Sequence, residues 1–104
     1  MGFFTMTADI NKGVEECRAT PGAILLDVRT PEEYKEGHIP GSVSIPLAAL
    51  PARYNELGAL DTPLFVHCLS GGRSGQAVSF LKSAGYTNVK NIGGINAWRG
   101  KVEY

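Results

Sequence analysis

Residues 64–85, LFVHCLSGGRSGQAVSFLKSAG, decide the fold of this 104-residue chain. Leu64–His67 is a short apolar run after Pro63, the pattern of a strand buried on both faces. Gly75–Ala84 carries apolar residues at helical spacing, and Gly85 follows where a helix commonly ends. Because a buried strand followed by a helix is half of a βαβ unit, the segment favours a parallel sheet.

The same alternation continues toward both ends of the chain. Further strands are expected at Phe3–Met6, Ala23–Val28, Val43–Ile45 and Val89–Ile92. Further helices are expected from an N-cap at Thr7 to Ala19, from a capping box at Thr30 to Gly37, at Ala52–Leu57, and after Gly93-Gly94. No repeat, linker or low-complexity tract divides the chain, so we expect one α/β domain over residues 1–104 with helices on both faces of the sheet.

Composition excludes several classes of protein. Ten basic and ten acidic residues and a pI near 6.7 argue against binding to nucleic acid or to a membrane surface. Two cysteines are too few for a disulfide scaffold, and the first residues lack the features of a secretory signal, so we expect a cytoplasmic protein with reduced thiols. Residues 62–104 hold five basic side chains and one acidic, so a site there should suit an anion.

The turn between the Leu64–His67 strand and the following helix is the expected site. It reads Cys68-Leu69-Ser70-Gly71-Gly72-Arg73-Ser74 and lies at the carboxyl end of a parallel strand, where such sheets bind ligands. The two glycines let backbone N–H groups turn inward, and the helix N-terminus adds partial positive charge. Both favour a thiolate, so Cys68 is predicted to be nucleophilic rather than an inert buried cysteine. Arg73 would either bind an anionic substrate or brace the loop.

Other reactive side chains fit structural roles better. His67 should point to the opposite face of its strand from Cys68, which argues against a Cys–His dyad. We expect His38 to hold a backbone contact in a turn, Cys17 to be buried and inert, and Trp98 to pack in the core. No His/Cys cluster has metal-ligand spacing and no phosphate-loop spacing occurs, so no metal or cofactor is expected.

Three motifs resemble a single-domain rhodanese: Asp27–Ser42 (DVRTPEEYKEGHIPGS), Cys68-x-x-Gly-x-Arg-Ser74, and Gly93–Trp98 (GGINAW). The resemblance covers residues from about 7 to 100. It implies a five-stranded, mostly parallel sheet and thiosulfate sulfurtransferase chemistry with no cofactor. Cys68 would carry the sulfur as a persulfide, cradled by the backbone amides of residues 69–73. Asp27 and Arg29 would help to hold the site.

The residues leave three functions open. The first is transfer of sulfur from an anionic donor such as thiosulfate to cyanide or a thiol, and the second is a persulfide carrier that serves a protein partner. The third is a Cys-dependent phosphatase or arsenate reductase, which the spacing disfavours because such enzymes have one more residue between Cys and Arg than the four found here. Asp27 and Arg29 also suit plain ion pairing, either Asp27 with Arg73 or Arg29 with Glu33.

Overall fold

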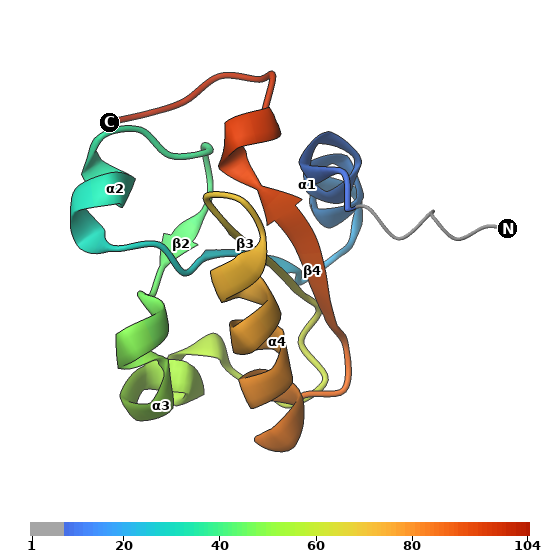
Figure 1. Ribbon diagram of the computed structural model, residues 1–104. Helices are drawn as coiled ribbons and strands as arrows, with labels where there is room; N and C mark the ends of the chain where they lie inside the picture. The colour runs from blue at the N-terminus through green and yellow to red at the C-terminus, as the bar shows by residue number, and fades with distance from the viewer. Residues whose placement is uncertain (1–7) are drawn as a thin grey trace, which may run out of the picture.

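The computed structural model describes residues 8–104, and the sheet in this range has four parallel strands in the order β2-β1-β3-β4 (Figure 1). They are β1 (Ile24–Asp27), β2 (Val43–Ser44), β3 (Leu64–Cys68) and β4 (Val89–Gly94). The parallel α/β prediction is confirmed, but the sheet has four strands rather than five. The remaining predicted strand, Phe3–Met6, lies outside the described residues.

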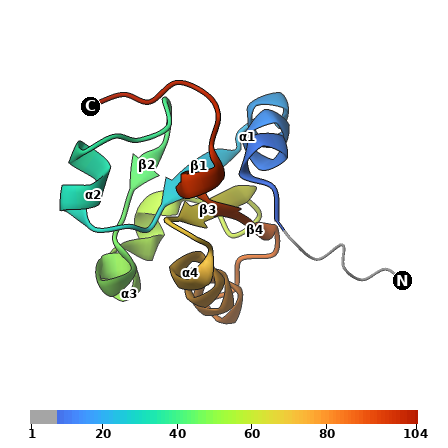
Figure 2. The ribbon, with the colours of Figure 1, turned by 45° about the horizontal axis from the view of Figure 1, so that its top comes forward.

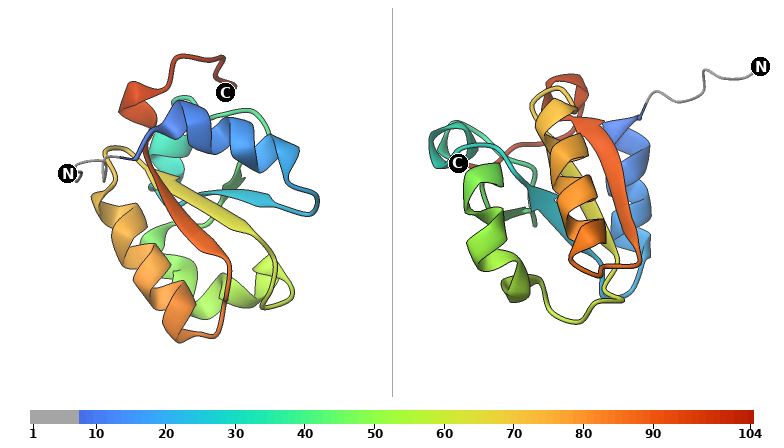
Figure 3. Two further views of the ribbon diagram at one scale, coloured as in Figure 1. Left: turned by 90° about the vertical axis from the view of Figure 1, so that its right-hand side faces the viewer. Right: turned by 60° about the horizontal axis from the view of Figure 1, so that its bottom comes forward.

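Helices cover both faces of this sheet. They are α1 (Ile10–Ala19), α2 (Pro31–Lys35), α3 (Leu50–Arg53) and α4 (Gly72–Ser83), with 3-10 turns at Leu47–Ala49, Tyr54–Leu57 and Ile95–Ala97. Helix α1 packs on one face, and α3 and α4 lie on the other (Figure 3). None of the helices in residues 8–104 is long and apolar enough to cross a membrane.

Three helix starts differ from the prediction. Helix α1 begins at Ile10, because the Asp9 carboxylate accepts the Asn11 N–H at 3.0 Å and so caps it; the predicted cap, Thr7, lies outside the described residues. The helical region predicted at Ala52–Leu57 begins earlier, at Leu47, as a 3-10 turn that leads into α3.

The third difference matters for the site. Helix α4 begins at Gly72 instead of Gly75, because Gly71 adopts the left-handed backbone conformation, with φ of 111°, that ends the preceding turn. Gly72, Arg73 and Ser74 therefore belong to the first helical turn and not to the loop.

Alternation along β3 divides the core into two layers. Leu64, Val66 and Cys68 face the apolar cluster under α3 and α4, whereas Phe65 belongs to the cluster under α1. The sheet thus presents Cys68 at the carboxyl end of a central strand, on the α4 face.

The C-terminal segment returns across the molecule toward α2 (Figure 2). Glu103 pairs with His38 as an isolated antiparallel bridge, with N–O distances of 2.7 and 2.9 Å. This bridge fixes the loop that joins α2 to β2.

Candidate active site

The Cys68 sulfur lies inside the turn that joins β3 to α4. Its Sγ accepts the Gly71 N–H at 2.9 Å and lies 3.4 Å from Ser74 Oγ, and the residue is only 1% exposed. The positive φ of Gly71 turns this amide toward the sulfur, a conformation that a side chain would strain. The sulfur is therefore enclosed on one side by the loop backbone and on the other by the first turn of α4.

Hydrogen bonding favours ionisation of this thiol. Burial alone would raise the pKa of Cys68, but the hydrogen bonds that the Ser74 hydroxyl and the Ser74, Gly71 and Ser70 amides can give a thiolate outweigh it. The net effect is a pKa below the ordinary thiol value. Burial of Cys17 in the α1 layer instead raises its pKa. The two cysteines thus differ in the direction that sequence reasoning expects.

The end of strand β4 and the 3-10 turn after it support the loop from the side. Asn96 donates its backbone N–H to the Leu69 carbonyl at 3.1 Å. A Cβ on Gly94 would lie 2.5 Å from Ser70 Cα and 2.7 Å from Leu69 C, so only glycine fits against the loop backbone. The Leu69 side chain points outward and is 44% exposed.

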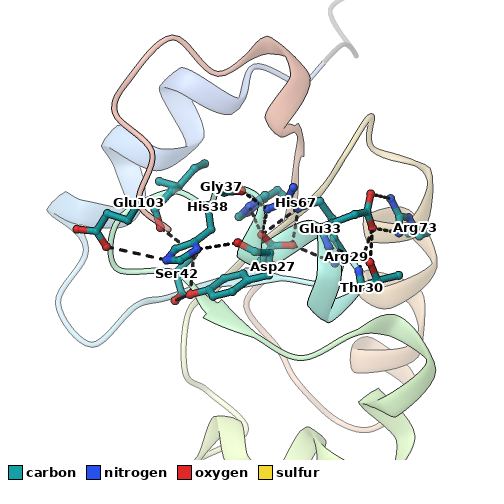
Figure 4. A network of polar contacts seen from close by, with 12 residues as sticks. Asp27, Arg29, Thr30, Glu33, Gly37, His38, Ser42, His67, Arg73 and Glu103 are labelled. Atoms are coloured by element: carbon teal, nitrogen blue, oxygen red, sulfur yellow. Dashed lines mark hydrogen bonds and ion pairs between the residues drawn. The ribbon is translucent and has the colours of Figure 1, made fainter.

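Arg73 at the start of α4 is paired with an acidic residue. Its guanidinium forms a two-pronged ion pair with the Glu33 carboxylate of α2, at 2.7 and 3.0 Å (Figure 4). The hydrogen bonds from Arg73 hold the pKa of Glu33 at about 2. Lys90 likewise pairs with Glu16 at 2.6 Å, so the basic excess of residues 62–104 is partly neutralised by acidic residues from the first half of the chain.

Asp27 and Arg29 pair with each other, not with Arg73 or Glu33 as the sequence suggested. Both are buried, and Arg29 Nη2 lies 2.8 Å from Asp27 Oδ2 and donates to the Gly37 carbonyl at 2.9 Å (Figure 4). Burial would raise the pKa of Asp27, but the nearby His67 and Arg29 hold it well below its usual range. These two residues tie the end of β1 to the turn after α2.

The two histidines make their contacts away from the Cys68 sulfur, which was predicted for His67 from strand alternation and for His38 from its place in a turn. His67 is fully buried, with Nε2 3.4 Å from Asp27 Oδ2, and neither ring nitrogen has a hydrogen-bond partner within residues 8–104. His38 stacks on Tyr34 and holds the Tyr34 carbonyl through Nδ1 at 2.9 Å. Neither histidine is placed to serve Cys68 as a base.

Two hollows flank the Cys68 loop. One, of about 390 Å³, has a lining that is half polar and half apolar, made by Ala8, Ser70, Gly71, Asn91, Gly93, Gly94, Asn96 and Ala97. The other, of about 240 Å³, is almost wholly apolar and is lined by Val28, Thr30, Pro46, Leu47, Ala48 and Arg73. Within residues 8–104, no group of three or more His, Cys, Asp or Glu side chains is placed to hold a metal ion.

Asn91 is a site residue that the sequence reasoning missed. Its Oδ1 lies 2.7 Å from Ser74 Oγ and accepts the Gly93 N–H at 3.0 Å, and its Nδ2 donates to the Gly71 carbonyl at 3.1 Å. A polar residue near the carboxyl end of a strand beside β3 was the available signal.

Comparison with known proteins gives consistent matches. The chain is 42% identical over 82 residues to YqhL of Bacillus subtilis, an uncharacterised protein, and 38% identical over 71 residues to the thiosulfate sulfurtransferase PspE of Escherichia coli. These matches cover 78% and 67% of this chain, and 64% and 68% of the relatives. The adenylyltransferase and sulfurtransferase MOCS3 of Arabidopsis thaliana is 36% identical over 95 residues, which cover 76% of this chain and 20% of that protein.

Among solved structures, the chain is similar to a rhodanese with anions from Escherichia coli. The TM-score is 0.72 at 33% identity, over 78% of this chain and 96% of that one. The family model of the rhodanese-like domain matches residues 7–101, nearly the whole chain. The chain therefore belongs to the rhodanese-like domain family.

Proposed function

We propose that this chain is a thiosulfate sulfurtransferase that carries sulfur on Cys68. One observation supports this most strongly: Sγ of Cys68 sits at the end of a buried strand and accepts a backbone N–H at 2.9 Å inside a tight turn. A persulfide ends in a small anion, and donors fixed in advance stabilise it without the cost of reorganising solvent. The name of the relative PspE agrees with this chemistry.

The reaction proceeds in two displacements. The Cys68 thiolate attacks the outer sulfur of thiosulfate; the S–S bond of thiosulfate breaks, and sulfite leaves with the electron pair. The product, Cys68–S–S⁻, keeps its negative charge at the terminal sulfur. Cyanide or a thiolate then attacks that sulfur and forms thiocyanate or a new persulfide, which regenerates the Cys68 thiolate. Ping-pong kinetics follow, and no general base is required because hydrogen bonds hold the pKa of the Cys68 thiol below its ordinary value.

Neutralisation of Arg73 by Glu33 affects how the donor is held. Because both guanidinium prongs bond the carboxylate, the backbone amides and the helix N-terminus supply most of the attraction for an anion. The same amides that bind the donor would then hold the persulfide, with Gly72, Arg73 and Ser74 fixing their position from the first turn of α4.

The spacing in the loop disfavours phosphatase or arsenate reductase chemistry. Four residues separate Cys68 from Arg73, one fewer than in the Cys-dependent phosphatases that share this fold. The smaller ring suits a sulfur atom better than a phosphoryl group.

A second candidate is a persulfide carrier that delivers sulfur to a protein partner. The exposed Leu69 and the apolar hollow beside Arg73 favour it, because both would contact an acceptor much larger than cyanide. The match to one part of a longer sulfurtransferase agrees with such a relay. A reducing compartment such as the cytoplasm would keep the thiols available for either role.

Intact-mass spectrometry after exposure to thiosulfate tests the proposal. We expect a gain of one sulfur atom that Cys68→Ser abolishes and Cys17→Ser retains, together with thiocyanate formation that follows the same pattern. Sulfur transfer that survives in Cys68→Ser would refute the mechanism. Hydrolysis of p-nitrophenyl phosphate without a sulfur adduct would point to the phosphatase instead.

A further inference from the structure

Asn91 joins three parts of the Cys68 site through one side-chain amide. Its orientation is fixed by two backbone groups that cannot exchange roles: the Gly93 N–H only donates, at 3.0 Å, and the Gly71 carbonyl only accepts, at 3.1 Å. The amide oxygen of Asn91 therefore faces the Ser74 hydroxyl, 2.7 Å away.

The Ser74 hydroxyl has one proton and three neighbouring acceptors. Its oxygen lies 2.7 Å from Asn91 Oδ1, 3.0 Å from the Gly71 carbonyl and 3.4 Å from Cys68 Sγ, and the residue has no exposed surface. The shortest distance places the proton on the bond to Asn91. The oxygen of Ser74 is then free to accept the S–H of a Cys68 thiol.

Ionisation of Cys68 changes this arrangement. Once the thiol proton has passed to water, the sulfur can only accept hydrogen bonds, so a stabilising contact requires the Ser74 hydroxyl to turn toward it. That turn leaves Asn91 Oδ1 with the Gly93 N–H alone. The thiolate and Asn91 thus compete for a single proton.

We propose that Asn91 is a positioning residue that holds the Ser74 hydroxyl away from the sulfur and thereby opposes ionisation of Cys68. The inference builds on the proposed role of Cys68 as a nucleophile. Its test measures ionisation and needs no sulfur transfer, so the two proposals can fail separately.

The charged groups around Cys68 do not control its ionisation in the way proposed for Asn91, because they are paired with one another. Arg73 on α4 is paired with Glu33 on α2, and Asp27 and Arg29 at the end of β1 are paired with each other. His67, on β3 itself, lies beside Asp27 on the other face of the sheet. On β4, Lys90 is paired with Glu16. Because Asn91 is uncharged, a substitution there by alanine leaves all of these pairs in place.

The experiment is a double-mutant cycle of Asn91→Ala and Ser74→Ala, read by the ultraviolet absorbance of the thiolate against pH. Subtracting the titration of the same protein with Cys68→Ser isolates Cys68 from Cys17 and the tyrosines. We expect Asn91→Ala to move the midpoint to lower pH and to raise the thiolate fraction below it by about threefold to tenfold. In the Ser74→Ala background the part of this fall that acts through the Ser74 hydroxyl should vanish. Loss of the Asn91 bond to Gly71 acts in both backgrounds and cancels in the cycle.

Two results would overturn the proposal. Equal shifts of the titration midpoint in both backgrounds would mean that Asn91 does not act through Ser74. A rise of the midpoint that requires Ser74 would mean that Asn91 helps the Ser74 hydroxyl to donate to the sulfur.

Asn91→Asp, which keeps the acceptor, provides a second test if the alanine variant fails to fold. It should raise the midpoint more with Ser74 present than without it, and an equal rise in both backgrounds would refute the inference. Asn88→Ala, an exposed asparagine before β4, is the matched control and should leave the midpoint unchanged.

Discussion

Gly94→Ala should displace the Cys68 loop without changing any group that touches the sulfur. Gly94 has extended backbone angles, φ −127° and ψ 142°, so alanine is conformationally acceptable there and the effect is purely steric. The new Cβ would lie 2.5 Å from Ser70 Cα and 2.7 Å from Leu69 C. Ordinary carbon–carbon contacts are about 3.5–4.0 Å, so the loop backbone has to retreat by about 1 Å.

A movement of this size should affect ionisation and turnover as well as folding. Overpacking typically costs about 1–3 kcal/mol of stability, whereas a 1 Å misplacement of catalytic groups can reduce turnover about 10²-fold. We expect the Cys68 thiolate titration to move to higher pH, because the Ser70 and Gly71 amides leave the sulfur. Urea unfolding, thiolate absorbance and thiocyanate formation measure the three effects.

Gly72→Ala is the matched control for this experiment. Nothing lies within 4 Å of a Cβ at Gly72, and the residue begins a helix, so stability and the Cys68 titration should stay near the wild-type values. If Gly94→Ala keeps the wild-type titration and turnover, the argument that β4 positions the loop is wrong.

Three further substitutions test other contacts. Glu33, with a folded-state pKa of about 2 against an ordinary 4.5, stabilises the fold fully above pH 4.5 and loses that contribution as the pH falls to 2. Glu33→Gln should therefore lower the free energy of unfolding by about 0.2–1 kcal/mol at neutral pH, because the pair is partly exposed to solvent, and should flatten its dependence on pH between those values; an unchanged acid profile would contradict the Arg73 pair. Asp27→Asn leaves Arg29 buried without its counterion and should cost about 3–5 kcal/mol in urea unfolding, and a loss below 1 kcal/mol would exclude that reading. Gly13→Ala puts a Cβ 2.5 Å from the Cβ of Ile92, so it should lower the melting temperature by overpacking the core under α1. The Cys68 titration should stay unchanged, and a shifted titration would contradict this prediction.

The β3–α4 unit could be predicted from sequence because its signals are local. An apolar run ends at Cys68, and Gly85, with φ of 110°, follows α4 as the periodicity indicated. The first residue of α4 was harder to predict from the sequence. Gly71 and Gly72 are identical in sequence terms, and only the left-handed backbone of the first shows where the turn ends.

The ion-pair partners suggested for Asp27 and Arg29 were wrong, because partners depend on the side of the backbone from which each side chain leaves. Asp27 and Arg29 are two residues apart, so their side chains leave an extended segment on the same side and meet each other. Strand periodicity contained that signal. The pairing of Arg73 with Glu33 spans 40 residues and depends on the packing of α2 against the start of α4, which periodicity does not specify.

The role of Asn91 could not be read from the chain for a related reason. Strand β4 pairs with β3 through a register shift between Val66 and His67, and this irregularity decides which β4 side chains lie beside the loop. A regular register, the default for prediction, gives a different set of neighbours.

Glu33 serves two structures at once, and this has an evolutionary consequence. Its Oε1 accepts the Thr30 backbone N–H at 2.9 Å in the capping box of α2, and the same carboxylate holds Arg73. In a relative that lacks Arg73, a carboxylate at position 33 no longer has an ion-pair partner. Glutamine at position 33 would still complete the capping box there. Positions 33 and 73 should covary among relatives, with acid and arginine gained or lost together, while position 30 varies independently of position 73.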